Sequence, residues 1–449
     1  MNKIKQSRKD NFWGVGNLGE GFISMVTNTY FSIFLTDVAA LPLNLVAFVS
    51  LFSSIFDFFM VPLSGGILVS LKPMRWGRLR SWLLICPPVA VLFFLLCFTV
   101  YQGSQTMTVV CILTGYLGAK AAWNITYAAN ASLTAVMATD VKSKSRLASQ
   151  RMIGSNAGRL LGNYLTPIIV AAAAVYAGES FGYRAAILFT GIVYILTSIA
   201  HFYISAGCEE VSGSRDGQSK EKVRERMSVT EVFRVLVNNA QLLITLVIDL
   251  TSNVASLVLP SLAVYYYKYC ACDSSLIPVH MLLTGLGGIT GAFLVRACGS
   301  QIRRPRKILL GLYLLVAASL FSIRLFPDLP AYFLCISGVV AVLTGMTSPF
   351  EMNLYMDNTV YYKKKTGQDA TGFIMGLSNL PVKFASIIKS TLIPFTLMAV
   401  GYVANAEPTP RMQRAIIDAY TLIPMLFPIL GFVLLKFFWK SGQEEKDRA

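Results

Sequence analysis

The chain has 449 residues, of which 55% are hydrophobic and only 14% are charged. Ordinary soluble domains carry about 25% charged residues, so this composition is typical of a polytopic helical membrane protein rather than a soluble one. The net charge of +16 would suggest nucleic acid in a soluble protein. Here the basic residues crowd alternate loops, and we expect no nucleic-acid partner.

Taken in chain order, the apolar segments predict twelve membrane-spanning helices, each long enough to cross a hydrocarbon core of about 30 Å. Their approximate ranges are 12–36, 42–71, 81–101, 106–137, 147–177, 184–206, 238–268, 275–297, 307–326, 330–358, 367–402 and 413–438. Several exceed the length that a crossing needs, which predicts tilt or extension into the cytoplasm. We therefore expect an all-α membrane protein.

The loops differ by charge, which predicts the topology. Lys and Arg gather in the loops after the even-numbered spans, whereas the alternate loops are short and poor in both. Both termini are therefore expected in the cytoplasm, with the chain a multi-pass protein of the cell (inner) membrane and the lipid bilayer as its partner. Four tryptophans near span ends predict an interfacial belt; they are Trp13, Trp76, Trp82 and Trp439.

The longest polar stretch follows the sixth span and divides the chain into two six-helix bundles. We expect an N-terminal bundle over 1–206, a cytoplasmic linker with an amphipathic lead-in over 207–237, and a C-terminal bundle with a short tail over 238–449. A weak repeat supports this division, because Asp140 and Asp357 each precede a basic turn at a helix end. Both acids are candidate gate or interdomain residues. Parallel six-helix repeats are typical of the major facilitator fold.

Charged residues inside the spans are the strongest functional signal. Asp57 lies in the second span, where a buried acid costs about 2.5–3.5 kcal/mol, so it should face a protein interior or a water-filled cavity. Lys120, Trp123, Asn124 and Tyr127 share one face of the fourth span by their spacing. Two interpretations stay open: a functional cavity, or an ion pair that joins the second and fourth helices. The two aromatic rings could stack on a sugar or simply pack.

Further polar residues mark other spans. Glu20 belongs to a polar stripe of the first span, Arg151 lies in the fifth and Lys383 in the eleventh. Asp249 and Glu351 are acids inside the seventh and tenth spans. Basic residues slightly outnumber acids within the spans, which favours an anionic solute because buried positive charge seeks a counter-ion.

Several segments together resemble a known family. They are GVGNLGEGF, TYFSIFLTDV, FDFFMVPLSGG, MRWGRLRSWLL, SRLASQRMIGSNAG, MDNTVYYKKKTG and NLPVKFAS, and they extend over nearly the whole chain. These segments are similar to those of the glycoside–pentoside–hexuronide cation symporters, the melibiose permease-like branch of the major facilitator superfamily. The resemblance implies a fold that alternates between inward- and outward-open states and moves a sugar-like solute together with a cation.

The resemblance also implies a cation site, from which this chain departs. Asp57 stands at the first ligand position and Asn124 aligns with the ligand in the fourth span. Met60 and Val61 occupy the positions of two further side-chain oxygen ligands. A sodium site needs several hard oxygen ligands. We expect Lys120 to place its ammonium where sodium would lie.

The sugar site implied by the family is altered as well. The two acids that hold sugar hydroxyls in the family align with Gly21 and Tyr127, and the stacking tryptophan aligns with Ala131. Arg151 and Lys383 keep the family's basic positions. Glu20 lies beside the family's acid rather than on it, a rotation of about 100° around the helix.

These observations predict a secondary active transporter of a glycoside or hexuronide-like sugar, working by alternating access without sodium, either proton-coupled or uncoupled. The alternative is a facilitator-fold carrier of a non-sugar organic anion, lipid or drug. We expect no enzyme, because no segment presents a nucleophile with a base, and no metal or other cofactor. The expected substrate-binding residues are Glu20, Trp123, Tyr127, Arg151 and Lys383; the expected coupling residues are Asp57, Lys120 and Asn124.

Overall fold

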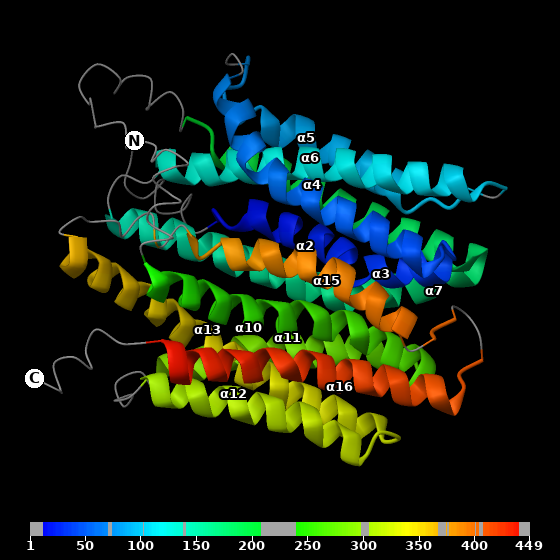
Figure 1. The fold of residues 1–449 in the computed structure, drawn as a ribbon. Coiled ribbons are helices and arrows are strands. Elements are labelled where there is room, and N and C mark those ends of the chain that lie inside the picture. Colours follow the sequence, from blue (N-terminus) through cyan, green and yellow to red (C-terminus); the bar gives the residue numbers. More distant parts are fainter. Residues whose placement is uncertain are drawn as a thin grey trace, which may run out of the picture. The chain divides into compact units, whose positions relative to one another are not determined.

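A computed structural model describes residues 12–70, 74–101, 103–137, 141–207, 239–297, 305–366, 374, 377–399, 401–403 and 407–439. In these residues the regular secondary structure is helical (Figure 1). The chain divides into two compact units, residues 1–222 and 223–449. Most of the predicted linker over 207–237 lies outside the described residues, and so does Asp140. The exact bundle boundaries therefore stay a prediction.

The first unit begins with a short helix, α2, that packs along the much longer α7. Its elements are α2 (Val15–Thr29), α3 (Phe31–Ile33), the π-helix η1 (Phe34–Val38), α4 (Leu43–Ser70), α5 (Trp82–Cys97), α6 (Gln105–Met137) and α7 (Val141–Ile204). Non-helical backbone at Ala177 and Gly178 breaks α7. The two halves of α7 pack against each other beyond this break. A Cβ on Gly182 would meet the Val170 carbonyl oxygen at 2.5 Å, which shows how closely the two segments approach.

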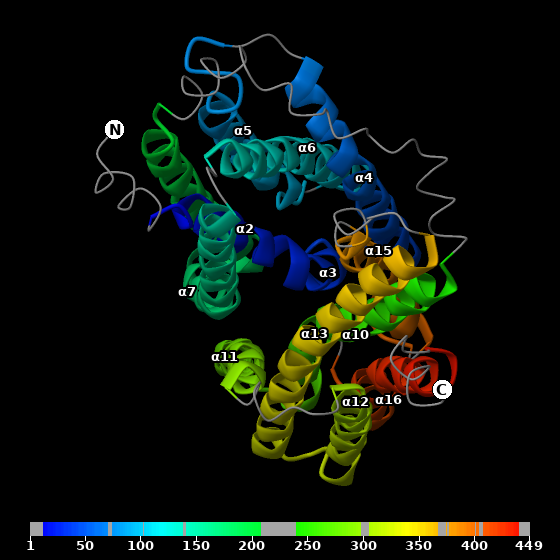
Figure 2. The ribbon, with the colours of Figure 1, turned by 90° about the vertical axis from the view of Figure 1, so that its left-hand side faces the viewer.

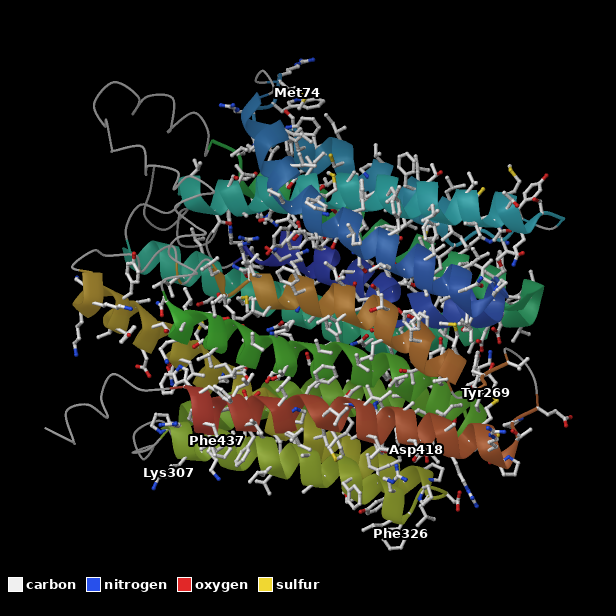
Figure 3. The ribbon with its side chains drawn as sticks, viewed as in Figure 1. Met74, Tyr269, Lys307, Phe326, Asp418 and Phe437 are labelled. Atoms are coloured by element: carbon white, nitrogen blue, oxygen red, sulfur yellow. The ribbon has the colours of Figure 1, made fainter. Side chains whose placement is uncertain are left out.

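The second unit has the same kind of architecture. Its elements are α10 (Ala240–Tyr265), η2 (Tyr266–Cys270), α11 (Leu276–Ala297), α12 (Pro305–Ser322), η4 (Ile323–Leu325), α13 (Pro330–Thr366), α15 (Leu380–Ala399), α16 (Pro410–Val433) and η5 (Leu434–Phe438). Figure 2 shows α12 beside α16. In Figure 3, Lys307 and Phe437 lie at one end of this unit, and Phe326, Asp418 and Tyr269 lie at the other.

Eight helical segments of the described chain are long and apolar enough to cross a membrane. One of them, in α7, has 56 residues and is long enough for two crossings at about 1.5 Å per residue. The long helix α6 is not among the eight, because polar residues such as Lys120, Asn124 and Asn130 interrupt its apolar sequence. The number of twelve spans stays a prediction.

The first helices of the two units end in the same unusual way. In each, a π-helical turn leads to a non-glycine residue with positive φ, 48° at Ala40 and 51° at Cys272. Matching hydrogen bonds close both ends: Leu41 N donates to the Leu35 carbonyl at 3.1 Å, and Asp273 N donates to the Tyr267 carbonyl at 3.0 Å. Each position in the second unit follows its counterpart by the same number of residues. The two units thus share a structural repeat that includes this strained backbone.

Glycines allow α2 and the first half of α7 to pack with their backbones in contact. A Cβ on Gly154 would meet the Gly14 carbonyl oxygen at 2.0 Å, and one on Gly158 would meet the Leu18 carbonyl oxygen at 2.0 Å. Close backbone approach through small residues is how helices associate where no hydrophobic effect drives them together. These glycines hold in place the helix that carries Glu20.

Replacing Gly158 by alanine should therefore destabilise the protein, although alanine favours a helix by about 1 kcal/mol over glycine. We expect a net loss on the order of 1–3 kcal/mol from overpacking. The matched control is Gly65→Ala in α4, where a Cβ meets nothing within 4 Å. Thermal unfolding of both purified variants in one detergent measures the difference. A Gly158→Ala protein as stable as Gly65→Ala would contradict the packing argument.

Two of the four tryptophans predicted for the interfacial belt are buried inside their units. Trp13 and Trp439 are 0% and 4% exposed, and both belong to hydrophobic clusters of their units. Each indole also finds an internal acceptor: Trp13 Nε1 donates to Thr134 Oγ1 at 2.9 Å, and Trp439 Nε1 donates to Thr245 Oγ1 at 3.2 Å. A threonine on another helix accepts the hydrogen bond of the indole N–H, so the ring can be buried inside the protein.

Candidate functional site

The buried acid of α4 is hydrogen-bonded to α6. Asp57 is 9% exposed, and its Oδ1 accepts a hydrogen bond of 2.8 Å from Asn124 Nδ2. The same amide donates to the Lys120 carbonyl at 2.8 Å, one helical turn earlier. The structure thus brings together Asp57 and Asn124, the two positions at which the family resemblance implies cation ligands.

Lys120 lies on the same helix, α6, and packs against two aromatic rings. It is 5% exposed, and its Nζ lies 5.4 Å from the ring centroid of Tyr116 and 5.3 Å from that of Trp123. Tyr116 also interacts electrostatically with Asp57. The ammonium and the carboxylate therefore both act on one tyrosine, and aromatic faces stabilise a cation that has lost its water.

A stacked aromatic pair continues the same face of α6. The rings of Trp123 and Tyr127 have centroids 5.4 Å apart with planes 15° from parallel. Arg151 of α7 places its Cζ 5.5 Å from the centre of the Tyr127 ring. Tyr127 is 45% exposed, while the buried Trp123 Nε1 has no hydrogen-bond partner within the described residues. The pair thus offers an accessible ring face and an unused donor.

Glu20 of α2 lies in a hydrogen-bond network with residues of α2 and α6. It is 3% exposed, and its two carboxylate oxygens accept hydrogen bonds from Asn17 Nδ2 at 2.9 Å and Asn130 Nδ2 at 3.2 Å. Arg151 Nε in turn donates to Asn17 Oδ1 at 3.4 Å. Glu20 therefore belongs to a buried polar network that reaches Arg151, and it does not stand alone in an apolar helix.

Gly21 cannot take the role of the family's sugar-holding acid. A Cβ at this position would meet the Ser155 carbonyl oxygen at 2.4 Å, because α7 packs directly against this face of α2. A carboxylate at residue 21 would have to displace the backbone of α7. Glu20, one position earlier, points to Asn130 of α6 instead.

The remaining predicted site residues lie in the second unit or outside the described chain. Lys383 is half-buried in α15, and Asp357 is exposed near the basic end of α13 that carries Lys363, Lys364 and Lys365. Asp140 falls outside the described residues. The gate or interdomain role of Asp140 and Asp357 therefore stays a prediction.

Two residues that were not among the predicted site residues also help to form this site. Asn130 donates a hydrogen bond to Glu20, and the ring of Tyr116 lies near the Lys120 ammonium and interacts electrostatically with Asp57. Both lie on α6, and both are spaced by three or four residues from positions already singled out on that helix. Helical spacing could have indicated Tyr116, which precedes Lys120 by four residues.

A comparison with known protein families decides the class of this protein. The family model described as MFS/sugar transport protein matches residues 12–439, which is nearly the whole chain. The chain belongs to this family. It is therefore a membrane transporter of the major facilitator superfamily and not an enzyme, and it is related to sugar symporters.

Individual relatives of this sugar transporter agree with the family assignment. It is 24% identical over 427 residues to an isoprimeverose transporter of Lactiplantibacillus pentosus, covering 94% of this chain and 87% of the relative. It is 21% identical over 439 residues to a glucuronide carrier protein homolog of Escherichia coli strain K12, covering 97% and 93%.

Among solved structures, a D-xylose-proton symporter superposes on the transporter with a TM-score of 0.64 at 12% identity, covering 96% of this chain and 97% of that one. A nucleoside transporter, NupG, gives a TM-score of 0.65 at 10% identity, covering 96% and 99%. At these identities the likeness concerns the fold alone, and it places the chain among major facilitator folds.

Proposed function

We propose that this protein is a secondary active transporter that moves a glycoside or a hexuronide-like sugar by alternating access. The observation that carries this proposal is the stacked Trp123–Tyr127 pair with Arg151 at its end. Aromatic faces suit the apolar face of a sugar ring, and the unpartnered Trp123 Nε1 can donate to a hydroxyl. The guanidinium of Arg151 offers a two-pronged donor for a carboxylate.

Glu20 complements this arrangement as the acceptor for sugar hydroxyls. Asn17 and Asn130 fix its carboxylate, so it is oriented before the solute arrives. Lys383 of the second unit is proposed as a further basic contact, because the family resemblance keeps a base at its position. Asp140 and Asp357 are proposed as gate or interdomain residues.

We further propose that coupling does not use sodium. Met60 is buried and Val61 is 42% exposed, and neither side chain supplies the oxygen ligands that a hard cation needs. Lys120 lies one turn before Asn124, the residue that touches Asp57. Its ammonium takes the place of the cation beside Asp57. Transport is then either uncoupled, or proton-coupled through Asp57 when Lys120 moves away.

The chain is proposed to lie in the cell (inner) membrane with both termini in the cytoplasm, because the basic loops require that side by the positive-inside rule. A carrier of a lipid, a drug or a non-sugar organic anion is the second candidate. The charged and amide side chains along α2, α6 and α7 disfavour lipids and most drugs, because apolar solutes leave such groups unsatisfied.

Uptake into proteoliposomes tests the proposal directly. A panel of neutral glycosides and glucuronides first identifies a transported sugar. Its uptake is then measured under an imposed sodium gradient, a pH gradient, both and neither. We expect the sodium gradient to leave accumulation unchanged, because Lys120 already neutralises Asp57. Sodium-driven accumulation by the native protein would contradict the coupling proposal, and uptake of no sugar would contradict the substrate class.

A further inference from the structure

The second unit holds two carboxyl groups between α10 and α13, the buried Glu351 and the half-buried Asp249, in a place that the proposed sugar site does not use. We call this region the acid seam. Three rungs of side-chain hydrogen bonds join the two helices there: Ser252 Oγ to Glu351 Oε1, Tyr355 OH to Asp249 Oδ2, and Asn358 Nδ2 to Thr245 Oγ1.

Each acid of the seam has a second donor. Tyr313 of α12 donates to Glu351 Oε1 at 2.7 Å, and Asn253 donates to Asp249 Oδ1 at 2.7 Å. Within the described residues, every hydrogen-bond donor to these carboxyls is a neutral hydroxyl or amide. Glu351 is 4% exposed, and the charged group that acts on it is Asp249. Two ionised carboxylates here would form an uncompensated double negative charge in an apolar span.

Such a charge is physically unfavourable. An isolated ionised carboxylate in a low-dielectric medium is strongly destabilised by the loss of its hydration, and real groups avoid this state by neutralisation. Two carboxyls that share one site also repel each other, so that they ionise in separate steps. The acid seam therefore requires either a proton or a bound cation.

An amide in the seam gives independent support for a ligand. Asn358 is 2% exposed, and its Nδ2 bonds Thr245 of α10 at 2.7 Å, which places the amide between the two helices. Its Oδ1 is buried without any donor in the described part of the chain. A buried acceptor without a donor is costly. The seam thus combines two carboxyls that have only neutral donors with one buried amide oxygen that has no donor among the described residues.

The repeat between the units adds a structural parallel. By the register that relates Ala40 to Cys272, Ser252 of α10 stands where Glu20 stands in α2. In the first unit, an acid on α2 meets an amide of α6; in the second, a hydroxyl on α10 meets an acid of α13. Each unit thus places one polar contact at the same level of its first helix.

We propose that Asp249 and Glu351 form a proton-binding site in which the two carboxyls share one proton. Ser252, Tyr313 and Tyr355 supply neutral donors to the remaining oxygens, and the open Oδ1 of Asn358 accepts from a water or hydronium on the way to the acids. The site is distinct from Asp57 and lies wholly in the second unit. Its existence does not depend on the identity of the transported solute.

Other ionisable groups lie on the helices α12, α13, α15 and α16 of the same unit. Tyr313 and Tyr355 face the acids from α12 and α13 and stay neutral as donors. The charged residues of α15 are Lys383 and Lys389, whereas the side-chain donors that Asp249 and Glu351 receive are hydroxyl and amide groups. Asp418 of α16 is paired with Arg324. The charged group that acts on Glu351 is therefore Asp249.

Infrared spectroscopy of the purified full-length protein, without sugar, tests this site. At neutral pH we expect a carboxylic-acid C=O band that shifts in heavy water. The component of this band that belongs to the seam should disappear in the Asp249→Asn/Glu351→Gln double variant, whereas any component from the buried Glu20 of the first unit should remain. Asp273→Asn, which alters an exposed loop acid, is the matched control and should keep the band. Tyr313→Phe should keep the band at a shifted frequency, because it removes one hydrogen bond from Glu351.

Each contrary outcome overturns the proposal in a different way. A carboxylic-acid band that is unchanged in the double variant would show that the proton does not lie on Asp249 or Glu351. If the double variant fails to fold, an unshifted band in Tyr313→Phe would do the same. The wild-type protein in sodium chloride and in choline chloride separates the two ligands, since loss of the band on adding sodium would identify an alkali cation site. None of these measurements uses transport, so failure of the sugar proposal leaves them decisive.

Discussion

Lys120→Met is expected to destabilise the protein by about 3–5 kcal/mol, the usual cost of removing one partner from a buried charge pair. The variant leaves the carboxylate of Asp57 facing Asn124 alone in an apolar helix. Asp57→Asn should cost a similar amount because it leaves the buried ammonium of Lys120 without its proposed partner. The double variant Asp57→Asn/Lys120→Met should recover most of the loss, because no buried charge then remains.

Thermal unfolding of the four proteins in one detergent gives the interaction energy as a double-mutant cycle. Lys307→Met, which removes an exposed lysine at the start of α12, is the matched control and should change little. Single-variant effects that simply add would show that the two charges do not interact. In that case sodium independence would need another explanation, and the proposed place of the Lys120 ammonium would be wrong.

Arg151→Gln is expected to reduce glucuronide binding much more than binding of the matching glucoside. A hydrogen bond to a charged group is worth about 1.5–3 kcal/mol, which corresponds to about 10–100-fold in Kd. The neutral glucoside has no carboxylate to lose, so its Kd should change little. Calorimetric titration of both sugars into the native and variant proteins measures the ratio.

Two further variants make this test specific. Arg151→Lys keeps the charge but loses the fork, so it should recover only part of the glucuronide affinity. Arg146→Gln alters an exposed arginine on the same helix and should preserve the preference. If the native protein binds the glucoside as tightly as the glucuronide, then Arg151 does not select a sugar acid, and the anionic part of the proposed substrate class is wrong.

Helical spacing and the family resemblance together anticipated part of the site. The spacing of Lys120, Asn124 and Tyr127 placed them on one face of α6, and the resemblance paired Asn124 with Asp57; the bond between these two is present. The partner of Glu20 could not be found in this way. Asn130 lies on a different helix, and no periodicity within α2 indicates which neighbour it faces.

Steric contacts between helices also lie beyond sequence patterns. Alignment showed glycine where the family has a sugar-holding acid, but only the packing of α7 explains why residue 21 has no room for a side chain. Trp13 and Trp439 were expected at the interface because tryptophans near span ends usually lie there. The threonines that accept their N–H groups are 121 and 194 residues away, so local sequence gave no sign of them.

By itself, the sequence determined that this is a polytopic helical membrane protein with acids and bases inside its spans, and its motifs indicated the transporter family. Hydrophobicity and helical period decide these properties, and both can be read within a single segment of about 20 residues. Only the tertiary structure decided that Glu20 meets Asn130, that Asp249 and Glu351 share a seam, and that Gly21 is closed. These depend on how each helix is rotated and shifted against its neighbours, which is fixed by the packing of side chains far apart in the chain.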